Sequence, residues 1–246
     1  MPPPLADRIA LVTGASRGIG YATALALAHA GAHVVAVART VGGLEELDDA
    51  IKAVGGAATL VPLDLKDYDG IDRLGRALQE RFGRLDILVG NAGILGPLSP
   101  LGHVPAKQWD EVMAVNVTAN WRLICAMDPL LKFSDAGRVV FITSGVAALA
   151  LAYWGPYAVS KSALETLART YAAETITTHV RVNLFTPGPV RTRMRAQAMP
   201  GEDPMTLDPP EKVAEKIVEL CLPSMQQSGK LYSYEKGKFL DLRPPA

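Results

Sequence analysis

The chain has 246 residues, of which 49% are apolar and 20% are charged, and its 25 Lys and Arg residues balance 25 Asp and Glu residues. This composition supports a packed core, and a net charge of zero gives no overall field that would attract nucleic acid or anionic lipid. We therefore expect neither partner, and the longest apolar stretch, Val146 to Trp154, falls far short of the ~20 residues of a membrane span.

Location and redox state are predicted from the N-terminus and the cysteines. Residues Met1 to Pro4 lack the basic and apolar stretches of a signal peptide, so a cytoplasmic protein is expected, with residues 1–6 disordered. Cys125 and Cys221 form no CxxC pair, and both are expected to be buried free thiols. The four histidines lack the spacing of metal ligands, so no metal site is predicted.

Apolar strand-like runs alternate with helical stretches along the chain. The predicted strands, in chain order, cover residues 8–13, 33–37, 57–63, 85–89, 138–143, 180–185 and 230–234. The predicted helices cover residues 19–30, 44–54, 67–82, 107–133 (as one helix or two), 157–178 and 210–222. The strands are apolar throughout rather than alternating, which indicates that helices cover both faces of the sheet. Strands joined by single helices run parallel.

This alternation predicts a single α/β domain over residues 1–246, with a doubly wound, Rossmann-type parallel sheet of about seven strands and helices on both faces. In such sheets the ligand binds at the carboxyl ends of the strands, so the residues that follow each strand are the candidates for function. Residues 94–105 and 187–210 are long segments rich in Gly and Pro, and we expect the second to be a lid over the substrate.

The turn after the first strand has the composition of a pyrophosphate site. Between the strand and the helix it contains Gly14, Ser16, Arg17, Gly18, Ile19 and Gly20. Glycines permit a tight turn and a close approach of the backbone, and the N–H groups at the start of the helix face an anion. We expect a dinucleotide here, and the alternative is a glycine-rich turn that serves packing alone.

The end of the second strand predicts which dinucleotide binds. An acidic residue there would accept hydrogen bonds from the ribose hydroxyls and would repel a 2′-phosphate. The sequence has no acid between Val35 and Thr40; it has Arg39, and Arg17 can reach the same place. Because guanidinium groups match phosphate in charge and geometry, we expect NADP(H) to be preferred over NAD(H).

Tyr157 and Lys161 lie near the start of the helix after the fifth strand, four residues apart and so on one helix face. A free Tyr has a pKa of about 10, and a cation about 4 Å away in a partly buried site supplies on the order of 4 kcal/mol. We therefore expect Lys161 to lower the pKa of Tyr157 toward neutrality, so that Tyr157 acts as a general acid and base. Ser144 ends the fifth strand, and its hydroxyl can hold a substrate oxygen beside Tyr157.

The spacing of these motifs resembles that of the short-chain dehydrogenase/reductase family over nearly the whole chain, and the segment Pro200-Gly201-Glu202-Asp203-Pro204 resembles a bacterial, NADP-preferring branch without an assigned substrate. The shared motifs are Gly14-xxx-Gly18-x-Gly20, Asn91-Ala92-Gly93, Asn116, Ser144, Tyr157-xxx-Lys161 and Pro187-Gly188. The resemblance implies an oxidoreductase that transfers a hydride between NADP(H) and a carbonyl or alcohol. Gly90 departs from the pattern where many members carry a second Asn, which indicates a slightly looser turn, and the C-terminus lacks the paired glycines of many tetrameric members.

The resemblance also assigns roles outside the catalytic pair. It implies that Asp64 and the backbone of Leu65 contact the adenine, and that the turn Asn91-Ala92-Gly93 passes the adenosine ribose. In the segment Pro187-Gly188-Pro189-Val190-Arg191-Thr192, it assigns Val190 and Thr192 to the nicotinamide carboxamide. It gives Asn116 the task of anchoring a water that connects Lys161 to solvent. A homodimer or homotetramer is implied, with dimer contacts through the helices that contain Cys125 and Tyr157.

Three segments, residues 94–105, 145–156 and 191–210, are predicted to line the substrate pocket. Its candidate wall residues are Leu95, Val146, Trp154 and Met194, which favours a largely hydrophobic carbonyl substrate. The alternative is that these residues pack under a loop or at a dimer contact. Three basic residues, Arg191, Arg193 and Arg195, either grip phosphates or an acidic substrate or are solvated.

Three other functions fit the same fold. A 3-oxoacyl-carrier-protein ketoreductase shares the chemistry, but the neutral charge balance shows no basic docking patch. A non-enzymatic NADP(H) redox sensor would have an impaired catalytic set, and all four residues are present here. A sugar-nucleotide epimerase or dehydratase usually adds a substrate domain, for which this chain is too short.

Overall fold

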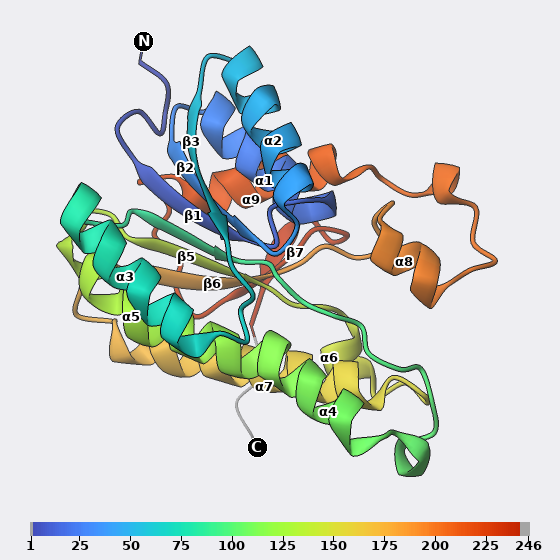
Figure 1. Cartoon of the computed structure of the whole chain (residues 1–246). Coiled ribbons are helices and arrows are strands. Elements are labelled where there is room, and N and C mark those ends of the chain that lie inside the picture. The colour runs from blue at the N-terminus through green and yellow to red at the C-terminus, as the bar shows by residue number, and fades with distance from the viewer. Residues whose placement is uncertain (1, 242–246) are drawn as a thin grey trace.

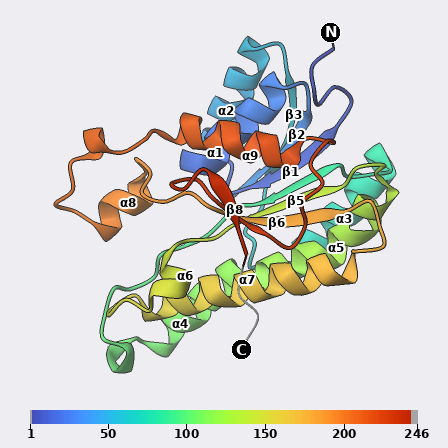
Figure 2. The same ribbon diagram turned by 180° about the vertical axis from the view of Figure 1, so that it is seen from behind.

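The computed structural model describes residues 2–241, which form one eight-stranded sheet with helices on both faces (Figures 1 and 2). The strands are β1 (Ile9–Thr13), β2 (His33–Ala38), β3 (Ala57–Pro62), β4 (Ile87–Gly90), β5 (Arg138–Ile142), β6 (Arg181–Thr186), β7 (Leu231–Ser233) and β8 (Lys238–Leu240). In space they follow the order β3-β2-β1-β4-β5-β6-β7-β8. The order reverses between β1 and β4, and this switch point is where doubly wound sheets bind ligands.

The helices form two layers around the sheet. The α-helices are α1 (Gly18–His29), α2 (Val41–Ala53), α3 (Tyr68–Phe82), α4 (Ala106–Met113), α5 (Ala119–Phe133), α6 (Val146–Leu149), α7 (Gly155–Glu174), α8 (Arg193–Ala198) and α9 (Pro210–Cys221). Short 3-10 turns cover Leu101–His103 and Pro204–Thr206. α1, α2 and α9 cover one face, and α3, α5 and α7 cover the other (Figure 1). Among residues 2–241 no helix is long and apolar enough to cross a membrane.

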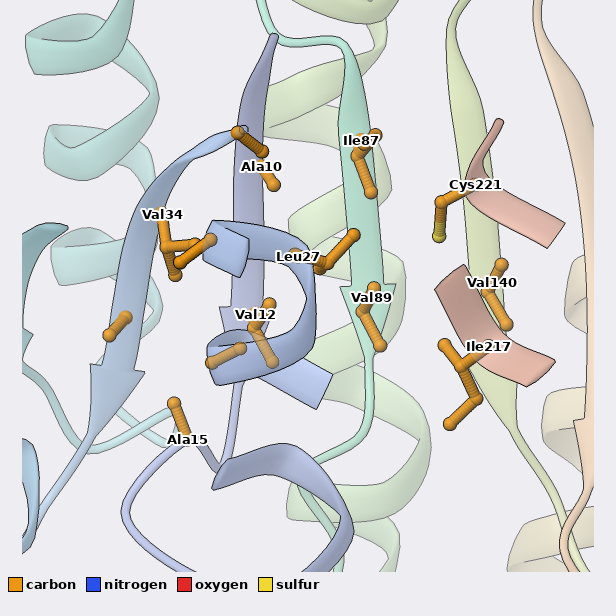
Figure 3. Packing of buried hydrophobic residues seen from close by; sticks show 14 of the residues in the cluster. Ala10, Val12, Ala15, Leu27, Val34, Ile87, Val89, Val140, Ile217 and Cys221 are labelled. Atoms are coloured by element: carbon orange, nitrogen blue, oxygen red, sulfur yellow. The ribbon is translucent and has the colours of Figure 1, made fainter. Parts of the chain in front are cut away.

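Each face of the sheet has its own apolar core. On the face of α1 and α9, Leu27 and Ile217 lie against Val12, Val89 and Val140 of three neighbouring strands (Figure 3). The strands are apolar on both sides because the opposite face packs against α3, α5 and α7. The predicted α/β fold with helices on both faces is therefore confirmed.

The end of the sheet differs from the prediction. We expected seven parallel strands joined by helices, but an eighth strand follows β7 through a short turn. β8 pairs with β7 in the antiparallel direction, as a strand joined by a tight turn must. Three residues are too few to show a hydrophobic pattern, which is why the sequence did not indicate this strand.

The expected disorder of residues 1–6 is wrong for the part that the structure describes. Leu5 is fully buried in the core beneath α1, and its N–H donates to the carbonyl of Ala30 at 2.9 Å. Met1 lies outside the described residues. The expectation for the thiols is also half wrong, because Cys221 is buried but Cys125 is exposed on α5.

Gly90, which the sequence suggested would loosen its turn, lies at a tightly packed position at the end of β4. Its partner in the sheet is Phe141, and a Cβ on Gly90 would lie 2.7 Å from Cε1 of that ring and 2.6 Å from Oδ1 of Asn120. Real carbon atoms do not approach so closely, so a side chain here would displace a fully buried phenyl ring. The glycine therefore tightens the end of β4.

Gly90→Ala is expected to lower the free energy of unfolding by about 1–3 kcal/mol, because overpacking forces a buried ring out of its place. Urea denaturation measures the change. The matched control is Gly42→Ala on α2, where an added Cβ would meet nothing within 4 Å apart from its chain neighbours and the backbone of its own helix. That control should raise stability by roughly 0.5–1 kcal/mol through helix propensity. Equal effects at the two positions would contradict this account of Gly90.

Candidate active site

One cavity of about 1080 Å³ lies at the carboxyl ends of the strands. It is lined by most of the residues predicted for cofactor and catalysis, namely Gly14, Ser16, Arg17, Gly18, Ile19, Arg39, Asp64, Leu65, Asn91, Ala92, Gly93, Ser144, Tyr157, Lys161, Pro187, Gly188, Val190 and Thr192. Gly20 and Asn116 instead lie behind the wall, where they contact residues that line the cavity. Among residues 2–241 no group of three or more His, Cys, Asp or Glu is arranged to hold a metal ion.

The glycine-rich turn after β1 forms one side of the cavity and is held from behind by Asn91. Gly14 and Gly18 have φ values of 66° and 57°, a conformation that favours glycine. A Cβ on Gly14 would lie 2.9 Å from Nδ2 of Asn91, and that nitrogen donates to the carbonyl of Thr13 at 2.9 Å. The side chain of Asn91 therefore fixes the shape of the turn.

The N-terminus of α1 opens into this cavity. Arg17, the residue before the helix, has an extended backbone with φ −169°, and no side chain within residues 2–241 caps the helix at that end. Uncapped N–H groups and the positive end of the helix dipole attract an anion. Together with the glycine cradle, this end of the cavity fits the pyrophosphate of a dinucleotide.

Two arginines line the cavity, Arg17 after β1 and Arg39 after β2. No acidic residue ends β2. Nη1 of Arg39 lies 3.9 Å from Oδ2 of Asp64, with both side chains about half exposed. Because an exposed ion pair of this kind contributes little, Arg39 remains available for a phosphate.

Ser144, Tyr157 and Lys161 meet on the opposite side of the cavity. Ser144 follows β5, and Tyr157 and Lys161 lie one helical turn apart near the start of α7. Both α7 side chains are buried, with exposed fractions of 8% and 3%. Nζ of Lys161 donates to the carbonyl of Ile142 at 2.8 Å and lies 5.6 Å from the centre of the Tyr157 ring.

Burial dominates the protonation of this pair. It raises the pKa of Tyr157 to about 12, although the hydrogen bond with Ser144 opposes part of the rise. It lowers the pKa of Lys161 to about 8, a change that the carboxylate of Glu165 partly opposes. The expectation that Lys161 brings the pKa of Tyr157 toward neutrality is therefore wrong for the protein alone, because desolvation of the phenolate raises that pKa and only the hydrogen bond with Ser144 lowers it.

Asn116 lies in a π-helical turn, Ala114–Thr118, between α4 and α5, where we expected one helix or two. Its Oδ1 accepts from the N–H of Ile94 at 2.9 Å, and its Nδ2 donates to the carbonyl of the same residue at 3.0 Å. Nδ2 also donates to Oγ of Ser160 at 2.9 Å, and that hydroxyl donates to the carbonyl of Tyr157 at 2.7 Å. Asn116 thus connects the loop after β4 with the catalytic turn of α7.

Two carboxylates belong to the site and were missed by the sequence analysis. Glu165 lies one turn beyond Lys161 on α7. Its Oε1 accepts at 2.8 Å from the hydroxyl of Thr143, the residue directly before Ser144. Glu235 follows β7 and lines the cavity, with its Cδ 2.6 Å from where a Cβ on Gly188 would lie. Glu165 could have been found from the sequence, because it lies four residues after Lys161 on the same helix face. Glu235 could not, because its place at the cavity depends on the position of β7 in the sheet.

The predicted substrate-wall residues do come together around Tyr157. Leu95, Val146 and Tyr157 form a small apolar cluster, and Trp154 and Met194 pack against it. The rings of Trp154 and Tyr157 have centres 6.2 Å apart. The apolar wall therefore begins directly at the phenol.

The segment 187–210 contains more structure than the expected lid loop. It includes α8, whose first turn is capped by Oγ1 of Thr192, which accepts from the N–H of Arg195 at 3.2 Å. Arg195 makes two hydrogen bonds of 2.6 Å to the carboxylate of Glu202, so its charge is paired within the same segment. An isolated β-bridge between Val190 and Asp208 joins the two ends of this segment.

Comparison with known proteins matches this geometry to one family. The model of the short chain dehydrogenase family matches residues 8–203. The chain is 39% identical over 212 residues to the uncharacterized oxidoreductase YciK of Escherichia coli, covering 85% of this chain and 84% of that protein. It is 38% identical over 210 residues to a rhamnolipids biosynthesis 3-oxoacyl-[acyl-carrier-protein] reductase of Pseudomonas aeruginosa, covering 83% and 80%.

Solved structures agree over almost the whole chain. A short chain dehydrogenase of Shigella flexneri complexed with NADP has a TM-score of 0.91 at 36% identity and covers 96% of this chain and 100% of its own. One from Escherichia coli complexed with NADPH has a TM-score of 0.89 at 36% identity and covers 95% and 98%. These similarities extend over both the sheet and the helices that carry the site.

Lys161→Met is expected to stabilise the protein at pH 7 by up to about 3 kcal/mol, because it removes a buried ammonium. The folded lysine has a pKa of about 8 against its usual 10.5. Between these values only the unfolded chain keeps the proton, so the stability of the native protein rises with pH through this window. The advantage of the variant should therefore shrink from pH 8 to pH 10.5.

Urea denaturation at pH 7 and pH 10 measures this difference. Lys132→Met is the control, because Lys132 is exposed and pairs with Asp128 on the same helix. It should change stability by less than about 1 kcal/mol at either pH. An advantage of Lys161→Met that is the same at both pH values would contradict the buried ammonium.

Proposed function

The chain belongs to the short-chain dehydrogenase/reductase family and is an oxidoreductase, and from that premise we propose that it transfers a hydride between NADP(H) and a carbonyl or alcohol, with Tyr157 as general acid and base. One observation carries the proposal: Ser144, Tyr157 and Lys161 line the same cavity as the glycine-rich turn after β1. A proton donor and an anion-binding backbone thus share one space.

The chemistry follows from the buried phenol. Because the pKa of Tyr157 is raised to about 12, its hydroxyl keeps its proton at neutral pH and can donate it to a carbonyl oxygen. The hydroxyl of Ser144 holds the same oxygen. A bound nicotinamide supplies the hydride in reduction and accepts it in oxidation. Lys161, with a pKa of about 8, carries its charge at pH 7 and stabilises the phenolate that remains.

Asn116 and Lys161 are suited to returning the proton to Tyr157. A Cβ on Gly93 would lie 3.3 Å from Oδ1 of Asn116 and 3.5 Å from Nζ of Lys161, so the glycine keeps the space between two polar atoms open. A water molecule there could bond both and connect Lys161 to solvent. In this proposal Asn116 acts through that water and through its grip on Ile94.

The preference for NADP(H) over NAD(H) rests on Arg17 and Arg39. Both line the cavity beyond β2, where an acidic residue would repel a 2′-phosphate. Asp64 and Leu65 at the adenine, and Val190 and Thr192 at the nicotinamide, complete the proposed binding residues. NADP and NADPH are bound to two of the similar dehydrogenases, which supports the same cofactor here.

We propose a homodimer or homotetramer whose subunits meet through α5 and α7. Trp121 on α5 and Val159 on α7 are exposed apolar residues, and contact with a second copy would cover them. Exposed Cys125 lies on the same helix as Trp121. A location in the cytoplasm remains a prediction from the sequence.

A 3-oxoacyl ketoreductase is the second candidate, and it is favoured by the similarity to the 3-oxoacyl-[acyl-carrier-protein] reductase of Pseudomonas aeruginosa. It uses the same proton transfer and differs only in what the carbonyl carries. A non-enzymatic redox sensor is disfavoured, because Ser144, Tyr157 and Lys161 line one cavity and Asn116 is bonded to the loop beside it.

Tyr157→Phe is expected to lower kcat about 100- to 10,000-fold, because it removes the general acid. NADPH oxidation with a panel of aldehydes, ketones, quinones and 3-oxoacyl thioesters measures turnover. NADPH affinity, measured by fluorescence, should stay within about twofold, because removing one hydroxyl leaves the phosphate contacts in place. The control is Tyr153→Phe, since Tyr153 is exposed and outside the cavity lining. Normal turnover by Tyr157→Phe would refute this mechanism.

Arg39→Ala is expected to weaken NADPH binding about 10- to 100-fold, because a charge-assisted hydrogen bond to phosphate is lost. NADH binding should hardly change, since NADH has no 2′-phosphate. Titration of each cofactor with wild type, the variant and the control Arg73→Ala measures this. Arg73 pairs with Asp67 outside the cavity lining. Equal loss of NADPH and NADH affinity would show that Arg39 does not select the phosphate.

A further inference from the structure

The cavity does not close beyond the apolar cluster at Tyr157. Three large apolar residues, Leu149, Leu151 and Met199, line it there and are also exposed to solvent, by 62%, 42% and 36%. We call these three residues the apolar rim. Single exposed leucines are common, but apolar side chains gathered at the mouth of one cavity indicate a surface that a ligand covers.

The apolar rim comes from two segments that flank the mouth. Leu149 ends α6 and Leu151 follows it, while Met199 follows α8, and both helices project beyond the carboxyl edge of the sheet (Figures 1 and 2). Trp154, Met194 and Ala198 pack against the apolar cluster at Tyr157 and line the same cavity as the apolar rim. Apolar side chains therefore line this cavity both beside the proton donor and where it opens to solvent.

The backbone at the apolar rim is strained. Ala150, between the two leucines, has φ 47°, and Tyr153 has φ 72°. Both are left-handed conformations that non-glycine residues adopt at a cost, and such strain concentrates at ligand sites. The N–H of Ser99 donates to the carbonyl of Tyr153 at 3.0 Å, which holds the segment against the loop after β4. Leu149 and Leu151, on either side of Ala150, both line the cavity.

Few charges oppose an apolar ligand at this end. The wall from Gly145 to Leu151 contributes no ionisable side chain. On the other side, Arg195 is bonded twice to Glu202, which leaves Arg193 as the α8 cation that lines the cavity without an ion pair among residues 2–241. An apolar substrate chain that lies along the wall from Gly145 to Leu151 therefore buries no charge, and Arg193 is the one α8 cation there that is unpaired among residues 2–241.

We propose that the substrate is a carbonyl compound, or its alcohol, with an extended apolar chain that leaves the cavity over the apolar rim. This inference rests on the proposed function, because it places the polar end of the same substrate at Tyr157 and Ser144. It adds that Leu149, Leu151 and Met199 recognise the apolar chain of the substrate.

The test measures binding separately from turnover. Straight-chain methyl ketones of increasing length, from butanone upward, are titrated by calorimetry into the protein with NADP⁺, a form in which no ketone can be reduced. The Kd of the wild type should fall about threefold for each added methylene, as expected for apolar surface leaving water. A Kd that does not depend on chain length would overturn the inference.

The double variant Leu149→Ser/Leu151→Ser removes most of the apolar rim. It should at least halve the dependence of log Kd on chain length and leave the Kd of butanone within about twofold, because the shortest ketone does not reach the rim. The control is Ile176→Ser, which removes an apolar residue that is 76% exposed beyond the end of α7 and should behave as wild type. An unchanged dependence in the double variant would also overturn the inference.

Two further measurements separate this inference from the proposed function. If chain length governs binding but NADPH is not consumed with any of the ketones, hydride transfer to them fails while the apolar rim stands. If NADPH is consumed but chain length has no effect, the apolar rim fails alone. Light scattering gives the mass of each variant. A lower mass of the double variant with an unchanged dependence on chain length would assign the residues to a subunit interface instead.

Discussion

The hydrogen bond of 2.8 Å from the Lys161 ammonium to the Ile142 carbonyl joins α7 to the end of β5. Ser144 lies two residues after that carbonyl, and Tyr157 lies one turn before the lysine, so this bond sets how the two hydroxyls face each other. Lys161 is 3% exposed, and water therefore hardly competes for its proton. A buried ammonium destabilises a fold unless it is well bonded. The carbonyl at the end of β5 gives it a partner at the place where the reaction needs it.

The cavity has two ends of opposite character, and the parallel sheet accounts for both. Backbone N–H groups, glycines and two arginines lie where the chain leaves β1 and β2. Apolar side chains lie where it leaves β4, β5 and β6. All of these strands end at one edge of the sheet. A charged dinucleotide can therefore bind the polar end of the cavity while an apolar substrate binds the apolar end, and the two meet between them.

Most of the fold could be predicted because uniformly apolar strands, joined by helices of ordinary length, leave few possible topologies. The motif residues could be assigned to one edge for the same reason. α6, α8 and β8 were missed, since elements this short show no periodicity. The pKa of Tyr157 was predicted in the wrong direction because spacing reveals that Lys161 is a neighbour but not how completely both groups are buried. Leu5 shows the same limit: residues 1–6 were expected to be disordered, and only the core beneath α1 explains its burial.

The β-bridge between Val190 and Asp208 closes the segment between these two residues into a loop with fixed ends. The carbonyl of Asp208 accepts from the N–H of Arg191 at 2.9 Å, and its carboxylate accepts from the hydroxyl of Tyr234 at 3.0 Å. The two ends of the segment between Val190 and Asp208 are thereby tied to each other and to the residues that follow β7, and this attachment does not depend on the residues between them. Loops with closed stems accept changes of length at small entropic cost. Evolution or an engineer can therefore exchange residues 193–207 as a unit and alter the choice of substrate, while Thr192 and the residues of proton transfer keep their positions.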